Sequence, residues 1–209
     1  MTDNDDDALV VSACRSLPPS RGTYDESDAI LNIVILPLDT RLTVGHIRPC
    51  GEHFKRVHRP NSNTVSDLQR LLQRFPRNKA GDLGAALEIW GRRYWNRIPQ
   101  LRGLVEYFVT RGIDSDADLR KWAQDSLFRR DFEGRVPGLQ FAMYKLLTIQ
   151  LGVDTIKPDT HVLNWLANVL HRRVSDQHAV DLLHHAAKEV GLSARELDLR
   201  IWEYQRENK

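Results

Sequence analysis

Cysteine is scarce in this sequence, since Cys14 and Cys50 are the only two among 209 residues. Two cysteines cannot build an iron–sulfur site of four cysteine ligands. One disulfide could form in principle, but the low count favours two free thiols in a cytosolic chain. We therefore expect neither a disulfide framework nor a cluster.

Long apolar runs are also missing. No stretch approaches the roughly 20 apolar residues that cross a membrane as a helix. The first seven residues (MTDNDDD) are acidic, whereas a secretory signal begins with basic residues. We expect this start to be disordered and residues 18–24 (PPSRGTY) to form a loop. The sequence thus predicts a cytoplasmic protein without a membrane partner.

An excess of one charge is absent, because 30 Lys and Arg stand against 28 Asp and Glu. The net charge of +2 says little about nucleic acid, but two local runs are more basic. The first, from Arg41 to Arg59, holds five Lys or Arg and one acid, Glu52. The second, with no acid inside it, consists of Arg92, Arg93, Arg97 and Arg102. Each run taken alone is more often a solvated helix face than a DNA contact.

Alternation of apolar and polar residues, the mark of a strand, is sustained nowhere. Apolar residues recur instead at helical spacing in segments 65–75, 98–109, 162–170, 182–190 and 197–204. Two more segments, 29–36 (AILNIVIL) and 139–151 (LQFAMYKLLTIQL), are apolar on most sides, as helices inside a bundle are. The pattern predicts an all-α protein.

Single residues mark where these helices begin and end. A serine before a helix caps its free N–H groups, and a glycine after a helix takes the left-handed backbone conformation. The predicted starting residues are Ser115, Ser175 and Ser193. The predicted residues that follow a helix are Gly112, Gly152 and Gly191.

The segment from 135 to 165 carries the most specific pattern. Residues 136–139 (VPGL) predict a tight turn between two helices, since proline presets one φ and Gly138 allows a positive one. A helix then leads to Gly152, and a short loop leads to 158–162 (PDTHV). There Asp159 occupies the N-cap position of the next helix, and capping alone could explain it.

This segment resembles the module of helix-hairpin-helix DNA glycosylases such as endonuclease III and the adenine glycosylases. In that family a Leu-Pro-Gly-Val-Gly hairpin precedes Val-Asp-Thr-His, and here Gly138 and Asp159 are 21 positions apart. Residues 36–44 (LPLDTRLTV) are similar to the family's early turn between helices. Residues 91–97 (GRRYWNR) are similar to the turn that faces the opposite DNA strand, and 197–204 (LDLRIWEY) to a closing helix. The resemblance covers about residues 26–206.

The resemblance implies an all-α fold of two lobes with a cleft between them. We expect residues 1–25 to contribute a short helix and a loop that pack on the C-terminal lobe. Residues 26–132 would form the central lobe, and 133–209 would carry the hairpin, Asp159 and the C-terminal helices. The hairpin and Asp159 would line the cleft.

The activity implied is that of a monofunctional DNA glycosylase acting as a monomer on a damaged, mismatched or modified base in double-stranded DNA. Such a protein would be associated with the nucleoid if bacterial. Asp159 would be catalytic, because a carboxylate stabilises positive charge on the sugar as the N-glycosidic bond breaks. The expected DNA contacts are Pro137, Gly138, Leu139, Gln140, Arg92, Arg93, Tyr94 and Arg97. The expected base pocket contains Asp39, Thr40 and Lys145. No cofactor is expected, although such hairpins can hold a monovalent cation.

Several positions depart from the family pattern. Gln140 replaces the second hairpin glycine and tolerates positive φ poorly, so the turn is expected to be altered. Ala142 stands where bifunctional members have the lysine that forms a Schiff base. Asp39 replaces an amide, and Pro158 replaces an aliphatic residue. These departures leave two alternatives open: a catalytically inactive relative that only binds DNA, and an all-helical protein-interaction domain.

Some of these residues also have plainer interpretations. Asp39 is more often a helix cap than a pocket residue. Tyr94 and Trp95 are more often core aromatics than side chains wedged into DNA, and the five tryptophans together are expected in the core.

Overall fold

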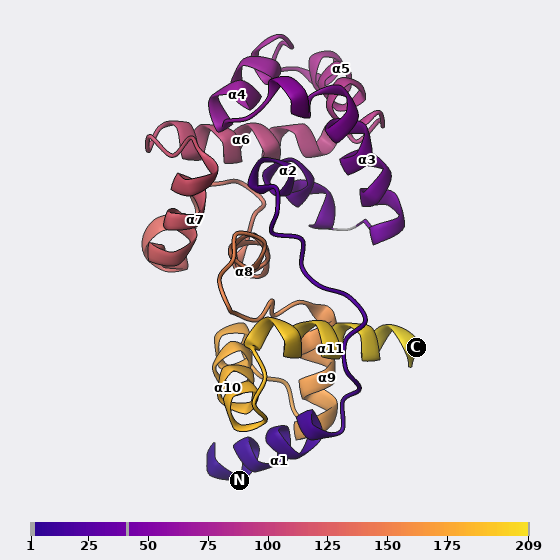
Figure 1. Ribbon diagram of the computed structural model, residues 1–209, viewed down its shortest axis with the longest axis vertical. Helices are drawn as coiled ribbons and strands as arrows, with labels where there is room; N and C mark the ends of the chain where they lie inside the picture. The colour runs from indigo at the N-terminus through magenta and orange to yellow at the C-terminus, as the bar shows by residue number, and fades with distance from the viewer. Residues whose placement is uncertain (1–2, 41, 209) are drawn as a thin grey trace. The chain divides into compact units, whose positions relative to one another are not determined.

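The computed structural model describes residues 3–40 and 42–208, and within them the chain is helical without a strand (Figure 1). The all-α prediction is therefore confirmed. The chain divides into two compact units. The continuous unit is Glu26–Leu151, and the discontinuous unit joins the residues up to Asp25 to those from Gly152 onward. In the described residues no helix is long and apolar enough to cross a membrane.

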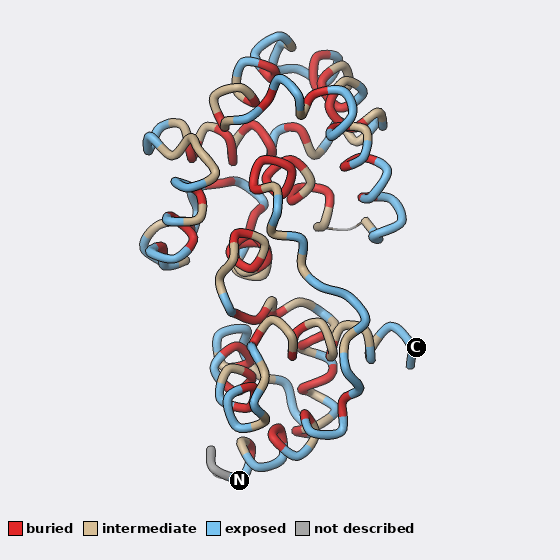
Figure 2. Tube along the Cα trace, viewed as in Figure 1, coloured by how far each residue is buried: buried red, intermediate tan, exposed pale blue. Residues whose placement is uncertain are grey.

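The continuous unit is built around one apolar helix, α2 (Ala29–Ile35). The rest of the unit, in chain order, is η1 (Leu36–Thr40), α3 (Val44–Val57), η2 (Arg59–Asn61), α4 (Val65–Gln73), α5 (Lys79–Trp90), η3 (Trp95–Arg97), α6 (Ile98–Val109), α7 (Asp116–Asp125), the π-helical turn η4 (Phe128–Phe132) and α8 (Phe141–Gln150). Residues 29–34 of α2 are all buried, as Figure 2 shows, and α2 contacts α3, α6, α7 and α8. The prediction of an apolar central helix over 29–36 is confirmed.

An aromatic cluster holds the chain that leads into the predicted hairpin. Trp122 of α7 packs edge to face on Tyr107 and Phe108 of α6, with ring centroids 5.9 and 4.9 Å apart. Phe132 lies 5.3 Å from Tyr107 and 5.5 Å from Tyr144 of α8. Edge-to-face pairs of this kind stabilise a core beyond the area they bury. The cluster therefore anchors both flanks of the hairpin to α6.

The discontinuous unit consists of α1 (Asp3–Arg15), α9 (Thr160–Leu170), α10 (Asp176–Glu189) and α11 (Ala194–Glu207). Helix α1 packs against α10 and α9. The prediction of a disordered start is wrong from Asp3 onward, while residues 1 and 2 lie outside the described residues. The side chain of Asp6 is buried and forms an ion pair with Arg172, which lies in the loop between α9 and α10. A disordered tail would not form this contact.

The units meet in the sequence at residue 151, whereas we expected a division at 132. Residues 133–151 belong with the continuous unit because α8 packs on α2, α7, η1 and η4. The predicted caps are confirmed: each serine accepts a hydrogen bond from an N–H of its helix, and each glycine has positive φ, at Ser115, Ser175, Ser193, Gly112, Gly152 and Gly191. Residues 18–24 contain no helix, as predicted.

Both cysteines are buried free thiols, as expected. Burial raises the pKa of Cys14 to about 12, so this thiol stays protonated at neutral pH. Of the tryptophans, Trp90, Trp122 and Trp165 are buried in the core. Trp95 is 38% exposed, so the expectation of a core position is wrong for it.

Candidate active site

Asp159 caps the N-terminus of α9, as the sequence predicted. Its backbone is extended, and Oδ1 accepts hydrogen bonds from the N–H groups of His161 (2.8 Å) and Val162 (3.2 Å). Its Oδ2 lies 3.6 Å from Nζ of Lys157, and the side chain is 19% exposed. One carboxylate oxygen is thus held by the helix end, while the other faces an ammonium group and retains some access to solvent.

A second carboxylate lies behind the segment that leads to Asp159. Asp198 of α11 is 2% exposed, and its Oδ1 accepts a 2.8 Å hydrogen bond from the backbone N–H of Lys157. Its Oδ2 accepts a hydrogen bond from the hydroxyl of Tyr24. Thr155 of the same segment is held by α10, because its hydroxyl lies 3.1 Å from Nε2 of His184. The segment before α9 is thus held by side chains of α11 and α10, and Tyr24 in turn holds Asp198.

Burial raises the pKa of Asp198 to about 7. The hydrogen bonds from Tyr24 and from the Lys157 N–H oppose this shift because they favour the ionised carboxylate, and the charge of Asp159 adds to it. The site therefore contains two carboxylates with Lys157 between them. Asp198 can change its protonation state near neutral pH.

Sequence reasoning missed Asp198 and Tyr24. Asp198 lies within the segment 197–204 that was recognised as a closing helix, but no role was assigned to it. Its signal is positional: the buried residues of α11 are Ala194, Leu197, Asp198 and Ile201, so an acid occupies the i+4 position of an apolar stripe. Tyr24 lies in the loop before α2 and has no comparable signal in the sequence.

The predicted hairpin is a tight turn that rests on α6. Val136 and Leu139 are buried, whereas Pro137, Gly138 and Gln140 are exposed. The turn closes through a 3.2 Å hydrogen bond from the Leu139 N–H to the Val136 carbonyl. The buried side chain of Leu139 cannot reach DNA, so only its backbone remains as a contact. Gly138 has φ +77°, the left-handed conformation that glycine favours.

Gln140 does not strain the turn. Its φ is −102° and its backbone is extended, and it occupies the N-cap position of α8. The expected conflict between glutamine and a positive φ does not arise, because only Gly138 in this turn has positive φ. Ala142 lies in the first turn of α8, where the structure has no amine.

The segment 91–97 exposes part of its basic run. Gly91 ends α5 with φ +63°, and Arg92 and Arg93 are exposed. Tyr94 and Arg97 are half-buried. Nζ of Lys79 lies 5.1 Å from the exposed ring of Trp95. The Trp95 ring is thus exposed beside a basic side chain.

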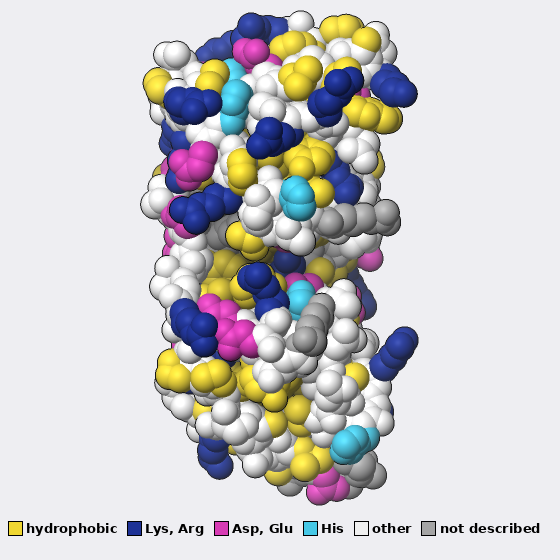
Figure 3. Space-filling view, turned by 90° about the vertical axis from the view of Figure 1, so that its right-hand side faces the viewer, with side chains coloured by type: hydrophobic (Ala, Val, Ile, Leu, Met, Phe, Trp, Pro, Cys, Tyr) yellow, Lys and Arg dark blue, Asp and Glu magenta, His cyan; other side chains and the backbone are white. Residues whose placement is uncertain are grey.

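Arg102 does not belong to this exposed run. It is 7% exposed and donates hydrogen bonds to Asp82 (3.2 Å) and to the carbonyls of Leu72 (2.9 Å) and Phe75 (3.0 Å). The interpretation of Arg102 as part of a solvated or DNA-facing run is therefore wrong. Arg41 of the other basic run lies outside the described residues. Elsewhere Figure 3 shows Lys and Arg dispersed over one face, with Asp and Glu among them.

The three expected pocket residues are half-buried and belong to the continuous unit. Asp39 and Thr40 lie in η1, where the Thr40 hydroxyl donates to the Pro37 carbonyl. Lys145 lies in α8 with Nζ 5.5 Å from the ring of Phe141. Asp159 belongs to the discontinuous unit, together with Lys157 and Asp198. Within the described residues no group of three His, Cys, Asp or Glu side chains could hold a metal ion.

Comparison with known proteins identifies a family for part of the chain. No curated protein and no solved structure matched the chain. Residues 99–206, more than half of the chain, match the family described as Domain of unknown function (DUF8548). The matched region includes α6, the hairpin, Asp159 and Asp198. The chain therefore belongs to the DUF8548 family.

Proposed function

We propose that this protein is a monofunctional DNA glycosylase of the two-lobed helix-hairpin-helix type, with Asp159 as its catalytic residue. The observation that carries the proposal is the carboxylate of Asp159. Its Oδ1 is fixed by two backbone N–H groups of α9, and its Oδ2 is left outside the helix. A helix N-terminus favours negative charge, so the carboxylate is suited to a cationic sugar in the transition state.

The reaction requires an extruded base. A base inside a duplex is out of reach, so it is flipped out at a cost of a few kcal/mol. Hydrolysis of the N-glycosidic bond then leaves the bonding electron pair on the base and positive charge on the sugar, which Oδ2 of Asp159 stabilises. Water then adds to the sugar carbon, and the proton that it loses neutralises the released base. No lysine nucleophile is needed in this sequence of events.

DNA binding is supported by the hairpin. Among the described residues, neither the Gly138 N–H nor the Gln140 N–H donates a hydrogen bond, and both residues are exposed. Backbone N–H groups at an exposed turn bind phosphate without reading sequence. The exposed Arg92 and Arg93 add positive charge within the same unit. These groups would position a duplex, while chemistry would depend on Asp159.

The test is base release from duplexes containing uracil, oxidised, alkylated or mismatched bases, compared between the wild type and Asp159→Asn. Asparagine caps a helix about as well as aspartate. Folding and DNA binding should therefore persist, while base release should fall by about 100-fold or more, as when one group that stabilises transition-state charge is removed. Base release by Asp159→Asn at the wild-type rate would refute the catalytic role.

Asp154→Asn is the matched control for this experiment. Asp154 is exposed, and its Oδ1 accepts a 3.0 Å hydrogen bond from the Arg195 N–H near the start of α11. It is thus another carboxylate held by a helix end in the same unit. We expect Asp154→Asn to release bases at the wild-type rate.

A catalytically inactive DNA-binding relative is the second candidate. The observation that favours it is the Lys157 ammonium 3.6 Å from Oδ2 of Asp159, a cation where the sugar cation would have to be stabilised. Tight duplex binding without release of any base from a broad panel would support this candidate.

A further inference from the structure

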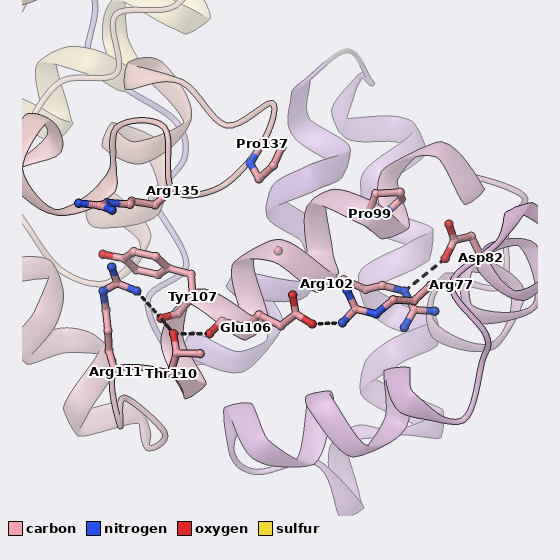
Figure 4. Close-up of a pocket in the computed structure, with 11 residues that line it drawn as sticks. Arg77, Asp82, Pro99, Arg102, Glu106, Tyr107, Thr110, Arg111, Arg135 and Pro137 are labelled. Atoms are coloured by element: carbon pink, nitrogen blue, oxygen red, sulfur yellow. Dashed lines mark hydrogen bonds and ion pairs between the residues drawn. The ribbon is translucent and has the colours of Figure 1, made fainter.

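The continuous unit contains a groove whose lining does not include Asp159, Lys157 or Asp198. It has a volume of about 640 Å³ and lies along α6 beside the hairpin (Figure 4). The lining includes four arginines and two acids: Arg77, Arg102, Arg111, Arg135, Asp82 and Glu106. We call it the α6 groove. Pro99, Tyr107 and Pro137 supply apolar surface between the charges.

Two of the four arginines are neutralised inside the groove. Arg102 is paired with Asp82, and Arg77 is paired with Glu106, as the dashed lines in Figure 4 show. Arg111 donates a 3.1 Å hydrogen bond to the Tyr107 carbonyl. No carboxylate of the described residues forms an ion pair with Arg111 or with Arg135. The groove therefore carries two uncompensated positive charges.

Asp131, a carboxylate whose charge is felt by Arg111, is already paired with another arginine. Asp131 lies close enough to Arg111 for the arginine to contribute to lowering its pKa, but its first partner is Arg130, whose guanidinium lies 2.7 Å away. Leu127 also donates its N–H to Asp131. Arg111 and Arg135 thus remain available to an anion from outside the protein.

The Tyr107 side chain provides a surface on which one of the two guanidinium groups stacks. The Arg111 guanidinium lies over the Tyr107 ring at 3.9 Å from its centroid, and Figure 4 shows Arg135 on the other side of this ring. The Tyr107 hydroxyl is itself fixed, because it donates to the Asp131 carbonyl (2.8 Å) and accepts from the Trp122 indole (3.1 Å). Stacking fixes the plane of Arg111, which reduces the entropy lost when it binds a phosphate.

The groove begins where the hairpin touches α6. A Cβ on Gly103 would lie 3.5 Å from Cδ of Pro137 and 3.5 Å from Cγ1 of Val136, so the hairpin lies close to α6 there. Arg135 directly precedes the hairpin, and Arg111 follows the end of α6. The two unpaired guanidinium groups therefore belong to segments next to the hairpin and its exposed backbone N–H groups.

We propose that the α6 groove binds the sugar–phosphate backbone of one DNA strand, with Arg111 and Arg135 contacting phosphates beyond the one at the hairpin. The proposal rests on the proposed function, because it assumes that the hairpin binds DNA. A single phosphate would fill only a small part of the groove, whereas consecutive nucleotides use its length. Planar guanidinium groups bind phosphate oxygens in pairs, and the proline and tyrosine surfaces suit the sugars.

The test is the salt dependence of duplex binding by Arg111→Gln/Arg135→Gln. Each lost phosphate contact lowers the slope of log K against log salt concentration by about 0.9. We expect the slope to fall by about one to two and affinity at low salt to fall by about tenfold or more, uniformly across sequences. Arg111→Lys/Arg135→Lys keeps both charges and should retain most of the slope.

The matched control is Arg173→Gln/Lys188→Gln, which removes two exposed charges from the discontinuous unit. It changes net charge equally, so a general electrostatic effect would lower its slope as well. An equal loss of slope in the control and the groove variant would overturn the proposal. So would a wild-type slope in the groove variant. Arg135→Gln alone leaves the stacked Arg111 in place, so it should fold normally and still lower the slope by about one phosphate contact.

The two proposals fail in different ways. If base release persists while the groove variant binds with an unchanged salt slope, the groove proposal is wrong and the glycosylase proposal stands. If no base is released from the panel but the groove variant loses slope, the groove proposal stands alone. Neutral methylphosphonate linkages, placed one at a time in the duplex, should weaken the wild type at groove-bound phosphates and leave the groove variant unaffected there.

Discussion

The backbone N–H of Lys157 donates a 2.8 Å hydrogen bond to Oδ1 of Asp198, 41 residues later in the chain. The side chain of the same lysine lies 3.6 Å from Oδ2 of Asp159. Asp198 therefore determines where the segment before α9 runs, although it does not touch Asp159 through a hydrogen bond. The position of the catalytic candidate depends on a buried acid in another helix.

The pH dependence of stability should report on Asp198. Its folded pKa is raised to about 7 from the ordinary value of 3.8, chiefly by burial. Between these values the folded state binds more protons than the unfolded state, so the free energy of unfolding falls as pH rises through this window. Below the window the group is protonated in both states, and above it the group is ionised in both. The destabilising contribution is therefore largest above pH 7.

Asp198→Asn removes this titration while its amide oxygen can still accept from the Lys157 N–H. The stability of the variant relative to the wild type should rise between about pH 4 and pH 7 and be constant above it. Urea unfolding at four pH values from 4 to 8 measures this difference. A difference that is the same at all four values would show that Asp198 is not the titrating group.

Removing the cap at Asp159 should cost stability that asparagine retains. Asp159→Ala leaves the N–H groups of His161 and Val162 without their acceptor, so the free energy of unfolding should fall by about 0.5–2 kcal/mol. Asp159→Asn should lie within a few tenths of a kcal/mol of the wild type. Thermal unfolding of both variants separates the capping role from the catalytic one, and equal melting temperatures for Ala and wild type would contradict the cap.

Sodium borohydride should trap no covalent complex with DNA. A Schiff base needs an amine at the sugar, and Ala142 supplies none. Strand breaks should then appear only after alkali or heat. Labelled duplex run on a denaturing gel after reduction is the measurement. A retarded band that disappears in Lys157→Gln would show that the amine beside Asp159 acts as the nucleophile.

An added methyl group should destabilise the protein at Gly138 of the hairpin and should be tolerated at Gly103 of α6. Gly138→Ala places a Cβ at φ +77° and 2.4 Å from Nε2 of Gln100, and the left-handed conformation alone costs about 1–2 kcal/mol. Gly103→Ala meets its neighbours at 3.5 Å, an ordinary contact, and replaces glycine inside a helix, which favours folding by up to about 1 kcal/mol. Urea unfolding should give opposite signs for the two variants, and the same sign would show that the turn geometry is wrong.

Arg102 and Arg77 should differ in what they contribute to stability. Arg102→Met leaves the buried Asp82 and two carbonyls without their donor, so it should cost about 3–5 kcal/mol. Arg77→Met breaks only the exposed pair with Glu106 and should cost about 0–1 kcal/mol. Equilibrium unfolding of both variants is the measurement. A small loss of stability in Arg102→Met would contradict the buried ion pair and support a solvated side chain at this position.

The fold class and the helix ends were predictable because their signals are local. The apolar runs of α2 and α8 required burial whatever surrounded them. Ser115 and Gly112 mark helix ends through bonds and dihedral angles within a few residues. The capping of α9 by Asp159 could be predicted for the same reason.

Contacts between distant residues were decided by tertiary structure alone. Asp6 looked like part of a disordered acidic tail until Arg172, 166 residues away, was placed beside it. Arg102 looked like one member of a basic run, but Asp82 and two carbonyls bury its charge. An ionic side chain can be buried only where another segment supplies its partner, and no sequence window contains both.

The same distinction between local signals and distant contacts applies to the candidate site. The sequence by itself determined that Asp159 begins a helix and that a Pro-Gly turn precedes it, because capping and turn chemistry depend on neighbouring residues. Only the tertiary structure decided that Asp198 and Tyr24, 174 residues apart, hold the approach to Asp159, and that Arg111 and Arg135 line one groove. The physical reason is that hydrogen bonds and ion pairs between helices depend on how the helices pack, which the helical period of one segment does not specify.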